Sequence, residues 1–411
     1  MHTDILPLFW EGAQTTMKKR IPFFHFLSPQ FLILTLVAFV ANFTYISTSI
    51  LFALFAQKNG LNVTETGIAI SSLTLGALMG GPIWGKFVDR NGKRKLTILI
   101  SVIGQGVFCL FTPLISGFLP LVLMRFGFGW FWVAQTPIVN EIIIKKRNIE
   151  ARNRELSWIN IIRGLSYSFA MLLSGYFSDF DPSWNFYLAG IVSLVNIYPI
   201  LLLKKVDGLR SQEKDLIIDN KWILKWKNFL FYLPIFLRST AVNGLSFFIP
   251  LFWKDKGLSS AFIGMVLGIS NLIQLMFFPL VGKMCSRKTK NIPIIIQLGY
   301  TLTVIPFIVA PFFYRGSSVF IPQSVLSISW VFFYIGTTLL LGEIAPHSQR
   351  TEALGWMETA FNLGGTIGPI TFSFILAGSS NNYLLSFISF SVLVFSALVI
   401  FSSYEKKYFK S

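Results

Sequence analysis

"GKFVDRNGKRK", residues 85–95, places one acid and five bases at the junction of two long apolar runs, residues 66–88 and 96–115. A run of this length forms a helix that crosses the ~30 Å hydrocarbon core of a membrane, since each helical residue adds ~1.5 Å. Ten further runs lie at residues 31–56, 121–144, 156–177, 185–203, 229–253, 261–285, 292–313, 319–341, 353–377 and 384–402. The runs lack the ten-residue alternation of a membrane barrel, and backbone groups in lipid must be satisfied within each segment. We expect an all-α membrane protein with twelve transmembrane helices.

The composition of the 411-residue chain supports a membrane protein and argues against an enzyme. Hydrophobic residues make up 53% of the chain and charged residues only 13%, which does not suit a soluble surface. The two cysteines, Cys109 and Cys285, have no metal or redox spacing, and the three histidines have no partner at useful spacing. The sequence contains neither a phosphate-binding loop nor a metal-ligand cluster. We predict no enzymatic activity, no cofactor and no metal site.

The positive charges are distributed unevenly between the two sides of the predicted membrane. With an internal N-terminus, 28 of the 35 Lys and Arg residues lie on one side. The other side has Lys58, Lys254, Lys256 and Arg315, and Arg125, Arg163 and Arg238 lie inside helices. This asymmetry follows the positive-inside rule, so we expect a multi-pass protein of the cell membrane with both termini in the cytoplasm. The net charge of +17 then requires no nucleic-acid partner.

The chain contains an internal repeat of six helices. A shift of 197 places "NGLNVTETG" (59–67) on "KGLSSAFIG" (256–264), and a shift of 198 places "RNRELSW" (152–158) on "RTEALGW" (350–356). Six is an even number, so the two copies have the same orientation in the membrane. The predicted segments are a cytoplasmic N-terminal segment (1–30), two six-helix bundles (31–203 and 228–403), a cytoplasmic central loop (204–227) and a cytoplasmic tail (404–411).

The charged turn has features of a hinge between helices. Gly85 allows close approach of another backbone, and Asn91-Gly92 is a tight-turn dipeptide. Asp89 lies where the second helix leaves the bilayer, and a carboxylate there favours the N-terminus of a neighbouring helix. Lys93 and Arg94 are placed to anchor the third helix at the anionic cytoplasmic leaflet.

The pattern G-x-x-x-D-R-x-G-[RK]-[RK] in this turn resembles the loop 2-3 signature of the major facilitator superfamily. Its residues here are Gly85, Asp89, Arg90, Gly92, Lys93 and Arg94. The resemblance implies two bundles that alternate access to a central cavity, an aspartate that braces the start of helix 11, and a gating network formed by the basic residues. The second copy, "GKMCSRKTK", departs from the pattern, because Ser286 replaces the aspartate and Thr289 the second glycine.

Charged groups inside the predicted helices are candidates for coupling or for salt bridges. Leu121, Arg125 and Gly129 are similar to an L-x-x-x-R-x-x-x-G element linked in that family to proton coupling, although Arg125 can also snorkel to the interface. Glu358 in helix 11 and Arg163 in helix 5 are further coupling candidates, and a permanent ion pair formed by Glu358 is the alternative. Cytoplasmic salt bridges are expected among Glu141, Arg152, Glu343 and Arg350.

The resemblance also implies that helices 1, 4, 7 and 10 line the cavity. The candidate solute contacts on these helices are Asn42, Tyr45, Trp132, Gln135, Arg238, Asn243, Trp330 and Tyr334. Aromatic rings in a cavity suit flat or cationic solutes.

The sequence predicts a secondary transporter, with proton-linked efflux of small amphipathic or drug-like solutes as the favoured function. Uptake of a sugar, small metabolite or organic anion is the first alternative, and a non-transporting sensor with the same fold is the second. The expected partners are a small-molecule substrate, membrane lipid and, as coupling ion, the proton, and the expected state is a monomer.

Overall fold

The structure is a computed structural model that describes residues 28–144, 149–203, 226–287, 291–345 and 349–409. All regular elements in these ranges are helices, and twelve spans within them are long and apolar enough to cross a membrane. The predicted all-α fold with twelve transmembrane helices is confirmed.

The first six spans are formed by nine α-helices and one 3-10 helix. They are α2 (Pro29–Ser49) with α3 (Phe52–Lys58), α4 (Val63–Asn91), α5 (Arg94–Phe111) with η1 (Thr112–Leu114), α6 (Phe118–Trp132) with α7 (Gln135–Ile144), α8 (Ile149–Phe180), and α9 (Ser183–Val195) with α10 (Ile197–Leu201). The apolar runs 31–56 and 121–144 were expected as single helices. The structure interrupts the first after Ser49 and the second after Trp132.

The last six spans have fewer interruptions. They are α11 (Trp226–Asp255), α12 (Ser260–Arg287), α13 (Ile292–Val309), η3 (Gly316–Val319) with α14 (Phe320–Ile344), α15 (Arg350–Gly378) and α16 (Tyr383–Phe409).

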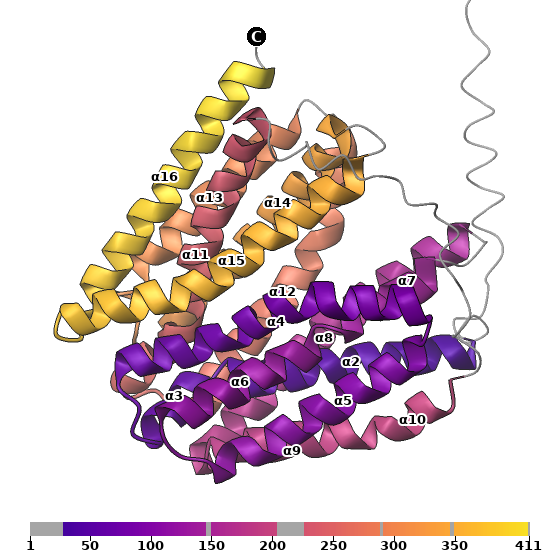
Figure 1. Cartoon of the computed structure of the whole chain (residues 1–411). Helices are drawn as coiled ribbons and strands as arrows, with labels where there is room; N and C mark the ends of the chain where they lie inside the picture. The colour runs from indigo at the N-terminus through magenta and orange to yellow at the C-terminus, as the bar shows by residue number, and fades with distance from the viewer. Residues whose placement is uncertain (1–27, 145–148, 204–225, 288–290, 346–348, 410–411) are drawn as a thin grey trace, which may run out of the picture.

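The two halves repeat the same helix pairing. In the N-terminal half α2 packs on α8 and α9, α4 on α6, and α5 on α6 and α9. In the C-terminal half α11 packs on α15 and α16, α12 on α14, and α13 on α14 and α16. These are equivalent pairs under the shift found in the sequence. Figure 1 shows the halves as two groups of helices set at an angle, with α4, α8, α12 and α15 between them.

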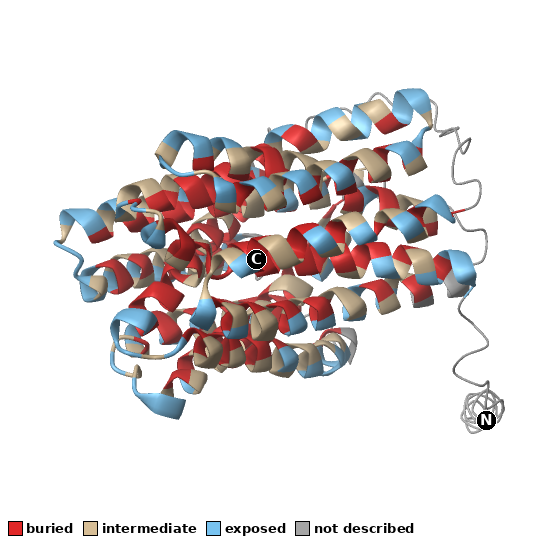
Figure 2. Ribbon diagram, turned by 90° about the horizontal axis from the view of Figure 1, so that it is seen from below, coloured by how far each residue is buried: buried red, intermediate tan, exposed pale blue. Residues whose placement is uncertain are grey.

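The molecule has a basic end and a far end. The basic end holds the turn at residues 91–94 and the last residues of α10, α12 and α16, and the far end holds the turns at 59–62 and 256–259. The two halves contact each other mainly through α4 with α15 and α8 with α12, and α3 adds a contact with α11 at the far end. The outer faces of the helices carry exposed large hydrophobic residues, as lipid contact requires, and Figure 2 shows these exposed positions alternating with buried ones along each helix.

Within the described residues, the hydrophobic core is shared between the halves only at the far end. There, one cluster joins residues of both halves, such as Phe55 and Phe248. Toward the basic end each half has a core of its own, one around Ile98 and Val139 and the other around Ile296. The halves are therefore packed together at one end and packed separately at the other.

Glycines on the helices between the halves show the same asymmetry. At the far end a Cβ added to Gly264 of α12 would lie 2.6 Å from the Cα of Gly175 of α8, so the two backbones are in direct contact. At the basic end a Cβ added to Gly85, Gly282 or Gly355 would meet nothing within 4 Å. The close approach expected for Gly85 is absent from this conformation.

Candidate functional site

Each half contributes an aromatic stack made of predicted solute-binding residues. In the N-terminal half Tyr45 of α2 stacks on Trp132, the last residue of α6, with ring centroids 4.2 Å apart and an interplanar angle of 11°. In the C-terminal half Trp330 and Tyr334 of α14 stack at 5.3 Å and 18°. Phe361 of α15 lies 5.5 Å from Trp330. All five rings are partly exposed, and stacked aromatic faces of this kind bind flat or cationic groups.

Two opposite charges lie beside these rings without contacting each other. Glu358 of α15 is exposed and forms no ion pair within 4.0 Å among the described residues. Arg163 of α8 belongs to the other half, yet both charges interact electrostatically with Tyr334 and Tyr167. The structure therefore brings two predicted coupling residues, Glu358 and Arg163, to one region between the halves.

Arg163 is held by neutral groups. Its Nη1 donates to Asn160 Oδ1 at 3.2 Å and its Nη2 to Asn140 Oδ1 at 2.9 Å. The buried Nε has no hydrogen-bond partner within the described part of the chain. Two asparagines thus orient the guanidinium but leave its positive charge uncompensated.

Arg125 is buried inside the N-terminal half and is only 1% exposed. Its Nη1 donates to the Thr48 carbonyl oxygen at 3.1 Å and its Nη2 to Ser49 Oγ at 3.2 Å. The guanidinium also lies 4.3 Å from the centroid of the Phe52 ring. Snorkelling is wrong for this residue, because the break between α2 and α3 supplies its hydrogen-bond acceptors.

Arg238 was expected to face the cavity, and the structure places it inside the C-terminal half instead. It is 1% exposed. Its Nε donates to Thr303 Oγ1 at 2.9 Å, its Nη2 donates to Ser329 Oγ at 3.2 Å, and its guanidinium lies 4.1 Å from the centroid of the Phe333 ring. The expectation of cavity exposure is corrected for this conformation, because hydroxyls on α13 and α14 draw the side chain into the bundle.

The three neutral polar candidates differ in exposure. Asn42 is buried and donates to the Ala38 carbonyl oxygen of its own helix at 2.7 Å, and Gln135 is buried and donates to Gln105 Oε1 at 2.7 Å. Asn243 is partly exposed and donates to the Ser239 carbonyl oxygen at 2.9 Å. Among the eight candidate solute contacts, those with partial exposure in this conformation are Tyr45, Trp132, Asn243, Trp330 and Tyr334.

The charged turn of residues 85–95 has the expected backbone. Helix α4 ends at Asn91, and Gly92 caps it with a left-handed φ of 63°. Asp89 and Arg90 are exposed, and Asp89 has no hydrogen-bond partner among the described residues. The first turn of α15 likewise receives no capping bond from the side chain of Gln349, its N-cap residue. The contact expected between Asp89 and helix 11 is not formed in this conformation.

Glu141 is paired with Arg94, an arginine that was not among the expected partners. Arg94, which is 1% exposed, donates from Nε to Glu141 Oε2 at 3.0 Å and from Nη2 to Oε1 at 2.6 Å. This bidentate bridge fastens the start of α5 to α7 inside the N-terminal half. The side chains of Arg152 and Arg350 lie outside the described residues, so the pairs expected for them with Glu141 and Glu343 stay predictions.

Two aspartates at the far end were not singled out from the sequence. Asp179, near the end of α8, accepts hydrogen bonds from the backbone N–H of Ser260 at 2.6 Å and of Ala261 at 3.0 Å, and Lys254 Nζ lies 3.6 Å away. Asp181 pairs with Lys58 within the N-terminal half. The signal was present in the sequence, since both acids directly follow the fifth apolar run on the side with only four bases.

Burial alone would raise the pKa of Asp181, but the hydrogen bonds from Lys58 and from Ser183 outweigh it. The pKa of this carboxyl is therefore held below its ordinary value. The Ser183 backbone N–H donates to Asp181 Oδ1 at 2.8 Å, so the acid also fixes the start of α9.

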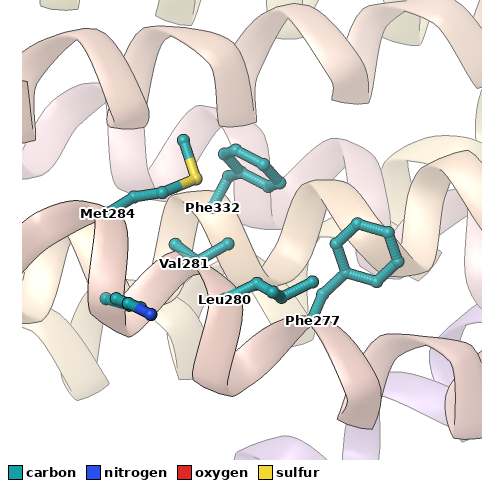
Figure 3. Close-up of a pocket in the computed structure, with 6 residues that line it drawn as sticks. Phe277, Leu280, Val281, Met284 and Phe332 are labelled. Atoms are coloured by element: carbon teal, nitrogen blue, oxygen red, sulfur yellow. The ribbon is translucent and has the colours of Figure 1, made fainter.

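A hollow of about 320 Å³ lies between α12 and α14, apart from the aromatic stacks. Figure 3 shows Phe277, Leu280, Val281 and Met284 on α12 and Phe332 on α14 around it. Leu280 is 56% exposed, so the hollow opens on the lipid-facing side of α12. Its lining is apolar apart from Lys283, which does not suit specific recognition of a polar solute.

The family model of the Major Facilitator Superfamily matches residues 34–369. The chain belongs to the major facilitator superfamily. This confirms the resemblance found in the charged turn, and the family assignment points to a transporter.

Curated relatives agree with the family assignment. The chain is 24% identical over 361 residues to the uncharacterized MFS-type transporter MJ1560 of Methanocaldococcus jannaschii. This match covers 83% of this chain and 90% of that protein. It is 25% identical over 141 residues to the quinolone resistance protein NorA of Staphylococcus aureus, which covers 34% of this chain and 36% of NorA.

Solved structures share the fold. The nucleoside transporter NupG superposes with a TM-score of 0.78 at 15% identity, covering 92% of this chain and 99% of that one. A bacterial homolog of the human lysosomal transporter Spinster, in an inward-facing and unoccupied conformation, also has a TM-score of 0.78 at 15% identity, and the match covers 94% of this chain and 98% of that one. At these identities the likeness shows the fold alone.

Proposed function

We propose that this transporter exports small amphipathic aromatic solutes by alternating access, driven by the proton gradient. The observation that carries the proposal is the division of the core, which is common to both halves at the far end and separate toward the basic end. Because twin bundles that share a core at one end can pivot about the region between them, this arrangement supports a solute path that is open toward the basic end and closed at the far end.

The aromatic stacks support the proposed class of solute. Tyr45 with Trp132 and Trp330 with Tyr334 offer partly exposed ring faces from both halves. A planar ring binds such faces by offset stacking, and a cation binds them through the ring quadrupole. The similarity to NorA, a quinolone resistance protein, supports export of drug-like solutes.

Glu358 supports proton coupling because no opposite charge holds it. Among the described residues it forms no ion pair, which leaves the carboxylate able to bind a proton or a cationic group of the solute. The permanent ion pair considered as the alternative is not formed with any described residue in this conformation. A carboxyl group that is solvated in one state and desolvated in the other changes its proton affinity between states, which is what coupling requires.

The experiment is flux in proteoliposomes with ethidium, a planar aromatic cation, as the probe. We expect an imposed pH gradient to drive ethidium transport by the wild type, and Glu358→Gln to move ethidium at a rate that no longer depends on the gradient. Glu352→Gln is the matched control, because Glu352 lies earlier on α15 and accepts a hydrogen bond from Trp356 at 3.3 Å. Gradient-driven transport by Glu358→Gln would contradict the coupling role, and wild-type vesicles that move no ethidium would contradict the solute class.

Arg163 favours one alternative, the transport of an organic anion. Its buried Nε has no partner within the described residues, and two asparagines hold the guanidinium in place. A carboxylate is the group that such a fork binds best. A parallel flux assay with benzoate tests this alternative, and Arg163→Gln is expected to abolish benzoate transport if it is correct.

A further inference from the structure

The start of α12 is capped by a residue from the other half of the molecule. Asp179 belongs to α8, and its two carboxylate oxygens accept the backbone N–H groups of Ser260 and Ala261 at 2.6 and 3.0 Å. These N–H groups have no partner within their own helix, and a negative charge at this position also interacts favourably with the helix dipole. The bond therefore joins the two halves at the far end.

The repeat explains why α12 takes its acid from the other half. The equivalent helix, α4, has a complete capping box of its own, in which Asn62 Oδ1 accepts the Glu65 N–H and Glu65 Oε2 accepts the Asn62 N–H, both at 2.9 Å. The shift of 197 places Ser259 on Asn62 and Phe262 on Glu65. Ser259 still accepts the Phe262 N–H at 3.2 Å, but the acid is missing, and Asp179 supplies it.

The register of α8 against α12 places Asp179 opposite that first turn. Gly175 of α8 contacts Gly264 of α12. Seven residues further along each helix toward the basic end, Asn271 Nδ2 donates a hydrogen bond to Ser168 Oγ at 2.8 Å. The helices are therefore antiparallel with matched steps. Four residues from Gly175 toward the far end, the same register pairs Asp179 with Ser260.

The helices α4 and α15 also pack antiparallel with matched steps, but the acid of this interface, Asp89, lies at the basic end. Gly67 contacts Ser373, and seven residues along each helix Thr74 bonds to Thr366 at 3.1 Å. Continued to the basic end, this register places Asp89 opposite residue 351, in the first turn of α15. In this conformation Asp89 is exposed and makes no such contact.

The register of each interface thus places one carboxylate opposite the first turn of the helix across it, and the two carboxylates lie at opposite ends of the molecule. The repeat mates of Asp89 and Asp179 are Ser286 and Ala377, which carry no charge. We infer that Asp179 is a positioning residue that latches the far end, engaged when Asp89 is released and released when Asp89 is engaged. This inference rests on the proposed alternating access and adds a second, diagonally placed latch to it.

The test measures both ends of the molecule with spin labels on repeat-related positions. Leu96 and Ile294 lie at the basic ends of α5 and α13. Leu114 ends the span of α5 at the far end, Phe312 lies in the turn that follows α13 there, and all four side chains are exposed. Each pair is replaced by cysteine, Cys109 and Cys285 are replaced by serine, and distances are measured by pulsed electron paramagnetic resonance in lipid nanodiscs.

Asp179→Asn is expected to lengthen the far-end distance and shorten the basic-end distance. The population ratio of the state closed at the far end to the state closed at the basic end should fall by about tenfold, as the loss of a charged hydrogen bond implies. Asp89→Asn should shift the same ratio in the opposite direction. Asp179→Glu, which keeps the charge, should return most of the wild-type distribution.

Asp181→Asn is the matched control, because Asp181 lies two residues away but pairs with Lys58 inside the same half. It should leave both distances unchanged. If Asp179→Asn does not fold, Lys254→Met weakens the same contact and should shift the ratio in the same direction.

Two results separate the latch from the proposed function. The latch is overturned, and alternating access left intact, if the wild type populates two states but Asp179→Asn does not change their ratio. The same conclusion follows if Asp179→Asn and Asp89→Asn shift that ratio in the same direction. Alternating access itself is overturned if the wild type gives a single label-to-label distance at each end, both with and without ethidium and at every pH.

Discussion

Arg238 keeps its positive charge inside a helix bundle with no acid beside it in the described chain. Two hydroxyl oxygens and the face of Phe333 surround the guanidinium, which satisfies part of its hydrogen-bonding capacity and adds a cation–π contact. Arg125 has similar surroundings, since its guanidinium donates to a carbonyl oxygen and a hydroxyl oxygen and lies over the ring of Phe52. Both arginines tie helices together within one half, whereas Arg163 has partial exposure between the halves, so only Arg163 remains placed for a solute.

The ion pair of Asp181 with Lys58 gives a pH dependence with a defined sign. The pKa of Asp181 in the folded protein is lower than its ordinary value of ~3.9, so the pair adds stability above about pH 4. That contribution is lost as the pH falls through the lowered pKa of the folded state. Because the side chains of Lys58 and Asp181 are 51% and 33% exposed, we expect only ~0.2–1 kcal/mol.

Asp181→Asn should therefore lower the thermal stability slightly at pH 7, and the difference from the wild type should shrink as the pH falls below about 4. Thermal unfolding of the purified protein in detergent, followed by tryptophan fluorescence, measures this difference. Lys58→Gln should show the same pH profile, and the double variant should add little to either single variant. A stability difference that stays constant from pH 7 to pH 3 would mean that Asp181 acts without its charge.

The space around glycines distinguishes three kinds of helix crossing among the described residues: close crossings within one half, close crossings between the halves, and crossings between the halves that are open in this conformation. Gly129 of α6 fixes a crossing within one half, because a Cβ there would lie 1.9 Å from the Leu73 carbonyl oxygen of α4. Gly264 forms a crossing between the halves that is closed at the far end. Gly85 and Gly355 face open space, and the register of α4 with α15 places them opposite each other when the basic end closes.

Valine at position 85 or 355 should therefore block closure without harming the present conformation. Gly85→Val and Gly355→Val are expected to keep wild-type thermal stability and to reduce ethidium flux by tenfold or more, because two backbones cannot approach across the added side chain. Gly342→Val is the control, since Gly342 also faces open space but lies on α14, away from this interface. Flux by Gly85→Val at the control's rate would show that these helices do not close in this register.

The sequence predicted helix number and approximate bounds well, because the apolar runs are long and their ends carry charge. It missed the break after Ser49, where no glycine or proline lies nearby. It also missed the break after Trp132, although Pro137 marks it, because a helical proline displaces the carbonyl of the residue four positions earlier, here Val133. It also gave the wrong direction for Arg238, because a residue number fixes the depth in the membrane but the packing of neighbouring helices decides which way a side chain points. Asp179 was missed for a related reason, as its partners are backbone N–H groups of a helix 81 residues away.

At the scale of the whole molecule, the repeat links the fold to the proposed motion. The pairs α4 with α15 and α8 with α12 are exchanged by the shift, so the halves meet across two equivalent interfaces. A symmetric molecule of this kind can close at either end through similar contacts. Departures from the repeat, such as Asp89 against Ser286 and Asp179 against Ala377, make the two closed states different and allow each to be stabilised separately.

The orientation of the molecule in the membrane is predicted by its charges. The described basic end carries Arg90, Lys93 and Lys95 in the turn after α4 and Lys406 and Lys407 at the end of α16, whereas at the far end Lys58 and Lys254 are paired with Asp181 and Asp179. The positive-inside rule then places the basic end in the cytoplasm.

Labelling of single cysteines with a membrane-impermeant maleimide tests this orientation. In a background without Cys109 and Cys285, both buried, Gln57→Cys at the far end should react in intact cells, and Asn91→Cys at the basic end should react only after the membrane is permeabilised. Both positions are exposed in the structure, so a failure to react reports the side of the membrane and not burial. Reaction of Asn91→Cys in intact cells would keep the fold but reverse the orientation, and the open end of this conformation would then face the exterior.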